Sequence, residues 1–258
     1  MFISTTDLEK IYKDDSVLII DARSYKDYTQ GHIPGAVSLD LFSFHWADTS
    51  QKGLMSFGEH MRKILSYAGV DENKKIIFYD DVTGMLAARG VWMCLYFSHP
   101  DVQMLDGGLS KWTGDNLPTV TESTIYKPSN LTAPIDPSII IGFEELNENI
   151  GKVTIIDARS PDEFDGTTPR AARGGHIPTA KNIDWNNNLD DSGKLKSDEE
   201  LESLYQIDKE TEIVTYCQGA YRAANSYLSL KKIGFKNIKV YLGSWGEWGN
   251  DLNLPIEK

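Results

Sequence analysis

The stretch that decides the fold occurs twice in this chain: VLIIDARS at residues 17–24 returns as VTIIDARS at residues 153–160. Each copy is a run of apolar, largely β-branched residues that ends in Asp-Ala-Arg, as expected of a buried strand. Further landmarks recur in the same order, namely GHIP at 31–34 and 175–178, IIFY at 76–79 with IVTY at 213–216, and Gly107/Trp112 with Gly243/Trp248. Because the spacing between counterparts is nearly constant, the sequence indicates a duplicated domain.

Within each copy, apolar strand-like runs alternate with segments that have the pattern of helices. This alternation favours parallel strand pairing with helices on both faces of the sheet. We therefore predict an α/β protein of two tandem domains, each a parallel sheet flanked by helices on both faces. The first domain is expected at residues 1–119 and the second at 138–258. Residues 120–137 are the predicted linker, because prolines at this density hold a segment extended rather than helical.

The composition indicates a folded protein that acts away from nucleic acids and membranes. Of 258 residues, 40% are hydrophobic and 25% are charged, which is enough for a proper core. The net charge of −12 argues against a nucleic-acid backbone as the main partner, yet it permits a small anionic substrate at a site with its own local field. The N-terminus has no signal-peptide pattern, and no apolar stretch approaches the roughly 18–20 residues that span a bilayer. We expect a cytoplasmic location.

One cysteine stands where a reactive thiol is expected. Cys217 directly follows the second-copy strand and opens the segment CQGAYR, which leads into a helical pattern. At such a position the backbone N–H groups and the helix dipole stabilise a thiolate, the nucleophilic form of cysteine. The alternative is a buried cysteine that merely fills space. We give that role to Cys94, which lies inside an unbroken apolar stretch, and the first copy carries Asp80 at the position of Cys217.

Taken together, these motifs resemble those of the two-domain rhodaneses, the thiosulfate and 3-mercaptopyruvate sulfurtransferases. The resemblance covers essentially the whole chain and rests on DARS twice, GHIP twice, the cysteine segment once, and LDGG at 105–108 with its counterpart at 242–248. It implies that Cys217 takes sulfur from a donor, holds it as a persulfide and passes it to a thiol or to cyanide. It also implies that the first domain is catalytically inactive, with Asp80 at the cysteine position.

The spacing between Cys217 and Arg222 separates two related chemistries. Four residues lie between them, which resembles the sulfurtransferases, whereas phosphatases of the same fold carry five. The small residues Gly219 and Ala220 suit a loop whose N–H groups converge on an anion. Arg222 is the expected clamp for an anionic donor, because its guanidinium presents a planar fork of donors.

Other candidate substrate-binding residues are Gln218 and Tyr221, which either donate hydrogen bonds at the site or face solvent. Arg170 and Arg173 lie in extra residues of the second copy, where the resembled family often places substrate-binding cations. Many members also carry an arginine at the position of Glu163, and its replacement here weakens the case for a carboxylate donor.

The remaining polar residues of the repeated motifs appear in both copies, including the one that lacks the cysteine. Asp21 with Arg23, and Asp157 with Arg159, are therefore interpreted as ion pairs that tie a strand end to a loop. His32 and His176 are interpreted as turn-packing residues, with a general base as the alternative. The sequence shows no metal-ligand spacing, no P-loop and no dinucleotide-binding glycine motif, so we predict no metal and no cofactor.

These observations leave several functions to compare. The leading hypothesis is a thiosulfate sulfurtransferase that works through a persulfide on Cys217, with thiosulfate as donor and a thiol or cyanide as acceptor. The nearest alternative keeps the mechanism and uses 3-mercaptopyruvate as donor. A further alternative is a sulfur-relay protein that passes persulfide sulfur to a partner protein, and the least favoured is a phosphatase.

Overall fold

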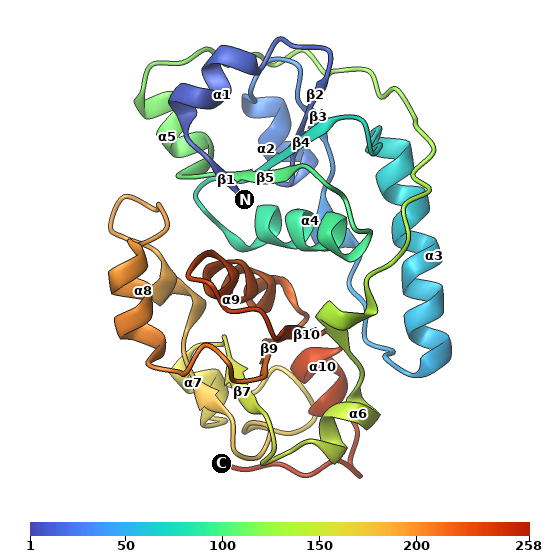
Figure 1. The fold of residues 1–258 in the computed structure, drawn as a ribbon, viewed down its shortest axis with the longest axis vertical. Helices are drawn as coiled ribbons and strands as arrows, with labels where there is room; N and C mark the ends of the chain where they lie inside the picture. Colours follow the sequence, from blue (N-terminus) through green and yellow to red (C-terminus); the bar gives the residue numbers. More distant parts are fainter. The chain divides into compact units, whose positions relative to one another are not determined.

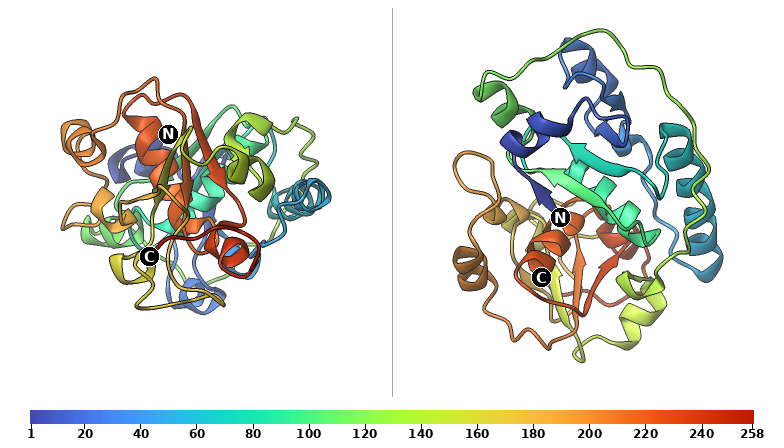
Figure 2. Two further views of the ribbon diagram at one scale, coloured as in Figure 1. Left: turned by 90° about the horizontal axis from the view of Figure 1, so that it is seen from below. Right: turned by 45° about the horizontal axis from the view of Figure 1, so that its top comes forward.

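The computed structural model describes residues 1–258, which form two compact units with one five-stranded sheet each. The strand orders, β1-β5-β4-β2-β3 and β6-β10-β9-β7-β8, repeat the same topology. Every strand pair is parallel. Helices flank both sheets (Figures 1 and 2). The predicted α/β class, with two tandem parallel-sheet domains, is confirmed.

The strands are short and buried at the centre of each sheet. The first sheet contains β1 (Phe2–Ile3), β2 (Val17–Asp21), β3 (Val37–Ser38), β4 (Lys75–Tyr79) and β5 (Val102–Leu105). The second contains β6 (Ile140–Ile141), β7 (Thr154–Asp157), β8 (Lys181–Asn182), β9 (Ile213–Tyr216) and β10 (Ile238–Tyr241).

The helices follow the strands in both copies. The first copy has α1 (Thr5–Ile11), α2 (Tyr25–Gln30), α3 (Gln51–Ala68), α4 (Met85–Tyr96), α5 (Gly108–Gly114) and the 3₁₀ turn η1 (Leu41–Ser43). The second has α6 (Phe143–Glu148), α7 (Pro161–Phe164), α8 (Asp198–Tyr205), α9 (Tyr221–Lys232), α10 (Ser244–Trp248) and the turns η2 (Pro137–Ile139) and η3 (Trp185–Asn188). No helix is both long enough and apolar enough to cross a bilayer.

Side-chain alternation along the central strands explains why helices cover both faces of each sheet. In β9, Val214 and Tyr216 pack with Trp245 and Trp248 of α10 in one buried cluster. Thr215 points to the other face, where its hydroxyl donates a hydrogen bond to a carbonyl oxygen of α9 at 3.0 Å. Both tryptophans are fully buried.

The repeated Asp-Ala-Arg motif forms the same ion pair in both units. Arg23 donates to Asp21 at 2.7 Å and to the carbonyl oxygen of Gly31 at 2.8 Å. Arg159 donates to Asp157 at 2.6 Å and to the carbonyl oxygen of Gly175 at 2.8 Å. Each arginine thus ties the end of a strand to the GHIP turn, which confirms the structural interpretation of the motif.

The repeated histidines are packing residues of those turns. His32 stacks on Tyr28 and His176 stacks on Phe164, each with ring centroids 3.7 Å apart. In each case Nδ1 also lies within hydrogen-bond distance of the carbonyl oxygen of that aromatic residue. The two turns therefore use the same combination of ring stacking and a backbone contact.

Neither unit is continuous in sequence. One unit comprises Met1–Phe44, Gly58–Asp136 and Leu189–Leu195, and the other comprises His45–Phe57, Pro137–Asn188 and Lys196–Lys258. Each unit therefore takes in a short segment from the other copy. Both segments follow the GHIP turn and the next strand of their own copy, so the exchange obeys the internal repeat.

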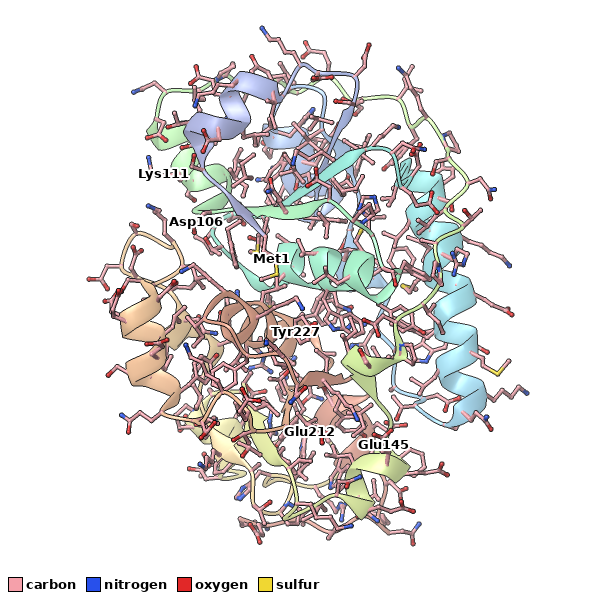
Figure 3. The ribbon with its side chains drawn as sticks, in the orientation of Figure 1. Met1, Asp106, Lys111, Glu145, Glu212 and Tyr227 are labelled. Carbon is pink, nitrogen blue, oxygen red and sulfur yellow. The ribbon has the colours of Figure 1, made fainter.

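The segment Leu189–Leu195 lies against the β4–α4 loop of the first unit. The backbone N–H of Thr83 donates to the carbonyl oxygen of Gly193 at 2.8 Å. Asp106, labelled in Figure 3, accepts hydrogen bonds from the Thr83 hydroxyl at 2.7 Å and from the N–H of Leu195 at 2.9 Å. The loop that corresponds to the cysteine segment is thereby held by side-chain and backbone bonds.

Asp80 fills that loop with a negative charge. Its carboxylate accepts hydrogen bonds from the backbone N–H groups of Gly84, Leu86 and Ala87 at 3.0–3.1 Å. Burial raises the pKa of Asp80 to about 6, against the opposing effect of these N–H donors. The start of α4 is therefore an anion cradle that the protein occupies with its own side chain.

The pH dependence of stability tests this arrangement. Because the pKa of Asp80 is raised from 3.8 to about 6 in the fold, its stabilising contribution is complete below the unfolded value and declines as the pH rises through 6. The wild type should therefore lose about 3 kcal/mol relative to Asp80→Asn between about pH 4 and pH 7. Urea unfolding of both proteins across this range measures the difference. A difference that stays constant with pH would contradict the assignment.

Candidate active site

Cys217 lies at the carboxyl end of β9, the middle strand of its sheet, and is 1% exposed. The following residues, Gln218, Gly219 and Ala220, form the loop. The helix was expected to begin after Arg222, but it begins at Tyr221. Ala220 is the N-cap of α9, so Tyr221 and Arg222 are already helical. The reason is the left-handed conformation of Ala220 (φ 67°), which turns the chain into the helix within three residues of the cysteine.

Ser244 holds the cysteine segment in shape. Its hydroxyl accepts hydrogen bonds from the N–H groups of Cys217 at 3.2 Å and of Ala220 at 3.1 Å, and it donates to the carbonyl oxygen of Tyr241 at 2.9 Å. The expectation that N–H groups of this loop converge on an anion does not hold for these two. They are turned toward a neutral oxygen on the neighbouring helix instead.

Ser244 adopts a backbone conformation that favours glycine. Its φ is 53°, and its counterpart in the first copy is Gly108 with φ 56°. A side chain in the left-handed region costs about 1–2 kcal/mol, which the hydroxyl's three hydrogen bonds offset. Sequence reasoning missed this residue, although the replacement of glycine by serine between the two repeats marks its position.

The exchanged segment His45–Phe57 contributes an imidazole next to the loop. The ring of His45 lies nearly parallel to that of Tyr221, with centroids 6.2 Å apart. A Cβ atom on Gly219 would lie 1.9 Å from Cε1 of His45, so any larger residue at this position would force the His45 ring to move. Thr49 anchors the segment by donating its N–H and hydroxyl to Glu247 at 2.7 and 2.5 Å. No local motif predicted His45, because its placement depends on the exchange between copies.

The guanidinium of Arg222 is already engaged by a carboxylate. Its two terminal nitrogens donate to the carboxylate of Glu163 at 2.5 and 3.0 Å, and the two side chains are only 13% and 8% exposed. Burial by itself lowers the pKa of Arg222, but the hydrogen bond to Glu163 and the charge of the Cys217 thiolate raise it overall. Glu163 replaces the expected arginine and binds the predicted anion clamp.

Glu163 has two further contacts, one with the N-cap of its own helix and one with Arg170. Burial raises the pKa of Glu163. The hydrogen bond and charge of Arg222, the backbone N–H of Ser160 and the charge of Arg170 outweigh burial and lower the pKa to about 2. Its carboxylate caps α7 through Ser160, accepting from the backbone N–H at 3.3 Å. Arg170 approaches the same carboxylate at 3.5 Å, and the Arg170 side chain is 53% exposed. Arg170 is therefore the more accessible of the two cations near Glu163.

Gln218 and Arg173 are both held by backbone groups. Gln218 donates its side-chain amide to the carbonyl oxygen of Arg170 at 3.1 Å. Arg173 donates to the carbonyl oxygens of Leu254 at 2.7 Å and Trp248 at 2.8 Å. These contacts give Arg173 a structural use, and its contact with substrate stays a prediction.

The geometry defines the class of site. A buried thiol stands at the carboxyl end of a central parallel strand, before a helix N-terminus and beside a guanidinium. Such an arrangement is that of a cysteine nucleophile and suits sulfur chemistry. No cluster of three or more His, Cys, Asp or Glu side chains has the geometry to hold a metal ion.

Comparison with known proteins agrees with this class. The rhodanese-like domain matches residues 4–115 and again residues 143–251. The chain therefore belongs to the rhodanese-like domain family and is a sulfurtransferase of the rhodanese type.

Individual relatives resemble the chain along its whole length. It is 34% identical to the sulfur carrier protein TtuD of Thermus thermophilus, over 100% of this chain and 96% of the relative. It is 29% identical to the thiosulfate sulfurtransferase of Pseudomonas aeruginosa, over 100% and 97%. Among solved structures, the 3-mercaptopyruvate sulfurtransferase SseA of Escherichia coli is 27% identical with a TM-score of 0.80, over 95% of this chain and 98% of that one.

Replacing Ser244 tests its role in the site. Ser244→Ala leaves two buried N–H groups without an acceptor and keeps the backbone strain, so we expect a loss of about 2 kcal/mol in unfolding free energy. Ser244→Gly removes the same hydroxyl but relieves the left-handed strain, and should be the more stable of the two variants. Both should alkylate more slowly at Cys217. Wild-type alkylation rates in both variants would show that the hydroxyl does not shape the loop.

Proposed function

We propose that this protein moves sulfane sulfur from thiosulfate to a thiol or to cyanide through a persulfide on Cys217. The observation that carries the proposal is the buried Cys217 at the start of α9 with Arg222 in the helix's first turn. The thiolate attacks the outer sulfur of thiosulfate. A sulfur–sulfur bond forms to Cys217, and the original bond breaks with its electron pair leaving on sulfite. An acceptor thiolate or cyanide then takes the terminal sulfur and regenerates the Cys217 thiolate.

The first unit supports the electrostatic part of this mechanism. There, Asp80 places one negative charge on the N–H groups of Leu86 and Ala87 in the first turn of α4. In the second unit, Arg222 and Ala223 occupy the same positions in α9. The Cys217 thiolate and the terminal sulfur of its persulfide each carry one negative charge. We infer that the backbone at the start of α9 stabilises both.

Two candidate donors differ in charge. Thiosulfate is favoured because the Pseudomonas aeruginosa relative is a thiosulfate sulfurtransferase and because Arg170 offers an accessible cation near the site. The structural resemblance to SseA keeps 3-mercaptopyruvate as the alternative donor. A relay role, in which a partner protein takes the sulfur, is favoured by the similarity to the sulfur carrier TtuD.

Intact-mass measurement tests the persulfide directly. Incubation with thiosulfate should add one sulfur atom to the wild type and none to Cys217→Ser. Cys94→Ser is the matched control: burial raises the pKa of the Cys94 thiol and keeps it from reacting, so this variant should gain sulfur like the wild type. The mechanism fails if the wild type gains nothing or if Cys217→Ser gains the same mass.

A charge variant at Arg170 tests the donor. Removing this cation in Arg170→Gln should lower kcat/KM about 3- to 10-fold for thiosulfate and less for 3-mercaptopyruvate, because the former carries two negative charges and the latter one. Lys181→Gln, an exposed lysine on β8, supplies the same change in net charge as a control. Equal losses for both donors, or the same loss in Lys181→Gln, would remove the argument for thiosulfate.

A further inference from the structure

We propose that Glu163 is a positioning residue for sulfur transfer: its two-point contact holds Arg222 for the sulfur of Cys217 rather than for the incoming donor. This inference rests on the proposed function. It changes the role expected of Arg222, from a clamp that binds the donor to a fixed cation that accompanies the sulfur through both half-reactions.

The geometry of the pair supports a fixed cation. The two terminal nitrogens of Arg222 each donate to a different oxygen of Glu163, at 2.5 and 3.0 Å, which restrains the plane of the guanidinium as well as its position. A donor that bound Arg222 in the same bidentate way would have to displace a buried carboxylate. The Cys217 side chain adjoins the same guanidinium, because a hydrogen bond and the thiolate charge at Cys217 both act on Arg222.

The first unit is an internal control for the role of Glu163. Asp27 stands at the corresponding position of α2, and its N–H donates to the Ser24 hydroxyl as that of Glu163 donates to the Ser160 hydroxyl. Its carboxylate accepts from the Ser24 hydroxyl, without the backbone contact that completes the capping box at Ser160. Yet the first two residues of α4 are Met85 and Leu86, where α9 has Tyr221 and Arg222. The unit without the nucleophile therefore keeps the cap and lacks the ion pair.

This contrast separates the two uses of the carboxylate. Capping needs only an acidic residue three positions after the serine, which both copies have. The ion pair needs the longer glutamate and an arginine on the nucleophile's helix, and it occurs in the copy that has the cysteine. The pair is therefore assigned to the chemistry at Cys217 and not to the stability of α7.

The proposal predicts that replacing Glu163 lowers kcat without raising KM. Glu163→Gln removes the charge-assisted hold, so Arg222 loses its fixed orientation toward the sulfur. A misplacement of this kind lowers the rate of the chemical step about 10- to 100-fold. The KM for thiosulfate should not rise, because the donor does not depend on Arg222 and a negative charge has been removed from its surroundings.

The experiment measures single-turnover persulfide formation on the purified full chain at varied thiosulfate, with acid quenching and intact-mass detection. Glu163→Gln and Arg222→Lys should both lower the maximal rate with KM unchanged or reduced. The double variant should be no slower than about the slower single variant, because the two side chains act as one unit. Thermal unfolding of each variant verifies that the chain is folded, and Glu163→Asp, which keeps the charge on a shorter stem, replaces Glu163→Gln if that protein does not fold.

Two control variants isolate the ion pair. Ser160→Ala removes the hydroxyl part of the cap on α7 and leaves both contacts between Glu163 and Arg222. Asp162→Asn removes an equal charge from an exposed neighbour in the same turn. Both should retain the wild-type maximal rate.

Several results would overturn the proposal. A rise in KM at unchanged maximal rate in Glu163→Gln or Arg222→Lys would make Arg222 a donor clamp. An equal loss of rate in Ser160→Ala would reduce Glu163 to a capping residue, and additive losses in the double variant would break the coupling. Failure of the wild type to gain any sulfur is a different outcome, since it overturns the proposed function itself.

Discussion

A helix that begins directly after a buried central strand leaves its first N–H groups without backbone partners, and both halves of this protein are built around that constraint. In the first unit the carboxylate of Asp80 accepts three such N–H groups around the start of α4. In the second unit the chain reaches α9 faster, through the left-handed Ala220, and the Ser244 hydroxyl takes the N–H groups of Cys217 and Ala220. Only the N-cap residues, Gly84 and Ala220, correspond between these two sets: Asp80 also binds the N–H groups of the first turn of α4, whereas Ser244 binds that of the cysteine itself.

Contacts from distant parts of the sequence then fix each loop. Leu189–Leu195 is bonded to the loop of the first unit through Thr83 and Asp106. His45–Phe57 belongs to the second unit, where His45 lies against Gly219 and Thr49 binds Glu247. Both loops are thus over-determined by several independent contacts, which is the condition under which strained backbone conformations persist.

The sequence predicted the features that repeat or follow a period. The duplicated strands, the parallel sheets, the Asp–Arg ion pairs and the position of Cys217 at a strand end all follow from patterns of spacing and polarity. The start of α9 at Tyr221 does not follow from such patterns, because nothing in the sequence indicates that Ala220 adopts a left-handed conformation. The contact between Glu163 and Arg222 joins positions 59 residues apart, and His45 reaches the loop only through the exchange of segments between copies. Periodicity carries no information about which distant side chains meet.

The filled cradle of the first unit also bears on how this protein diverged after its duplication. Restoring a cysteine at Asp80 would meet a loop one step longer before its helix, an apolar pair at the start of α4, and a glycine where the other copy has Ser244. The first copy therefore differs from the second at three places besides Asp80 itself. A cysteine at position 80 alone would not reproduce the surroundings of Cys217, so a second site of the same kind would need coordinated changes in the loop, in α4 and in the glycine.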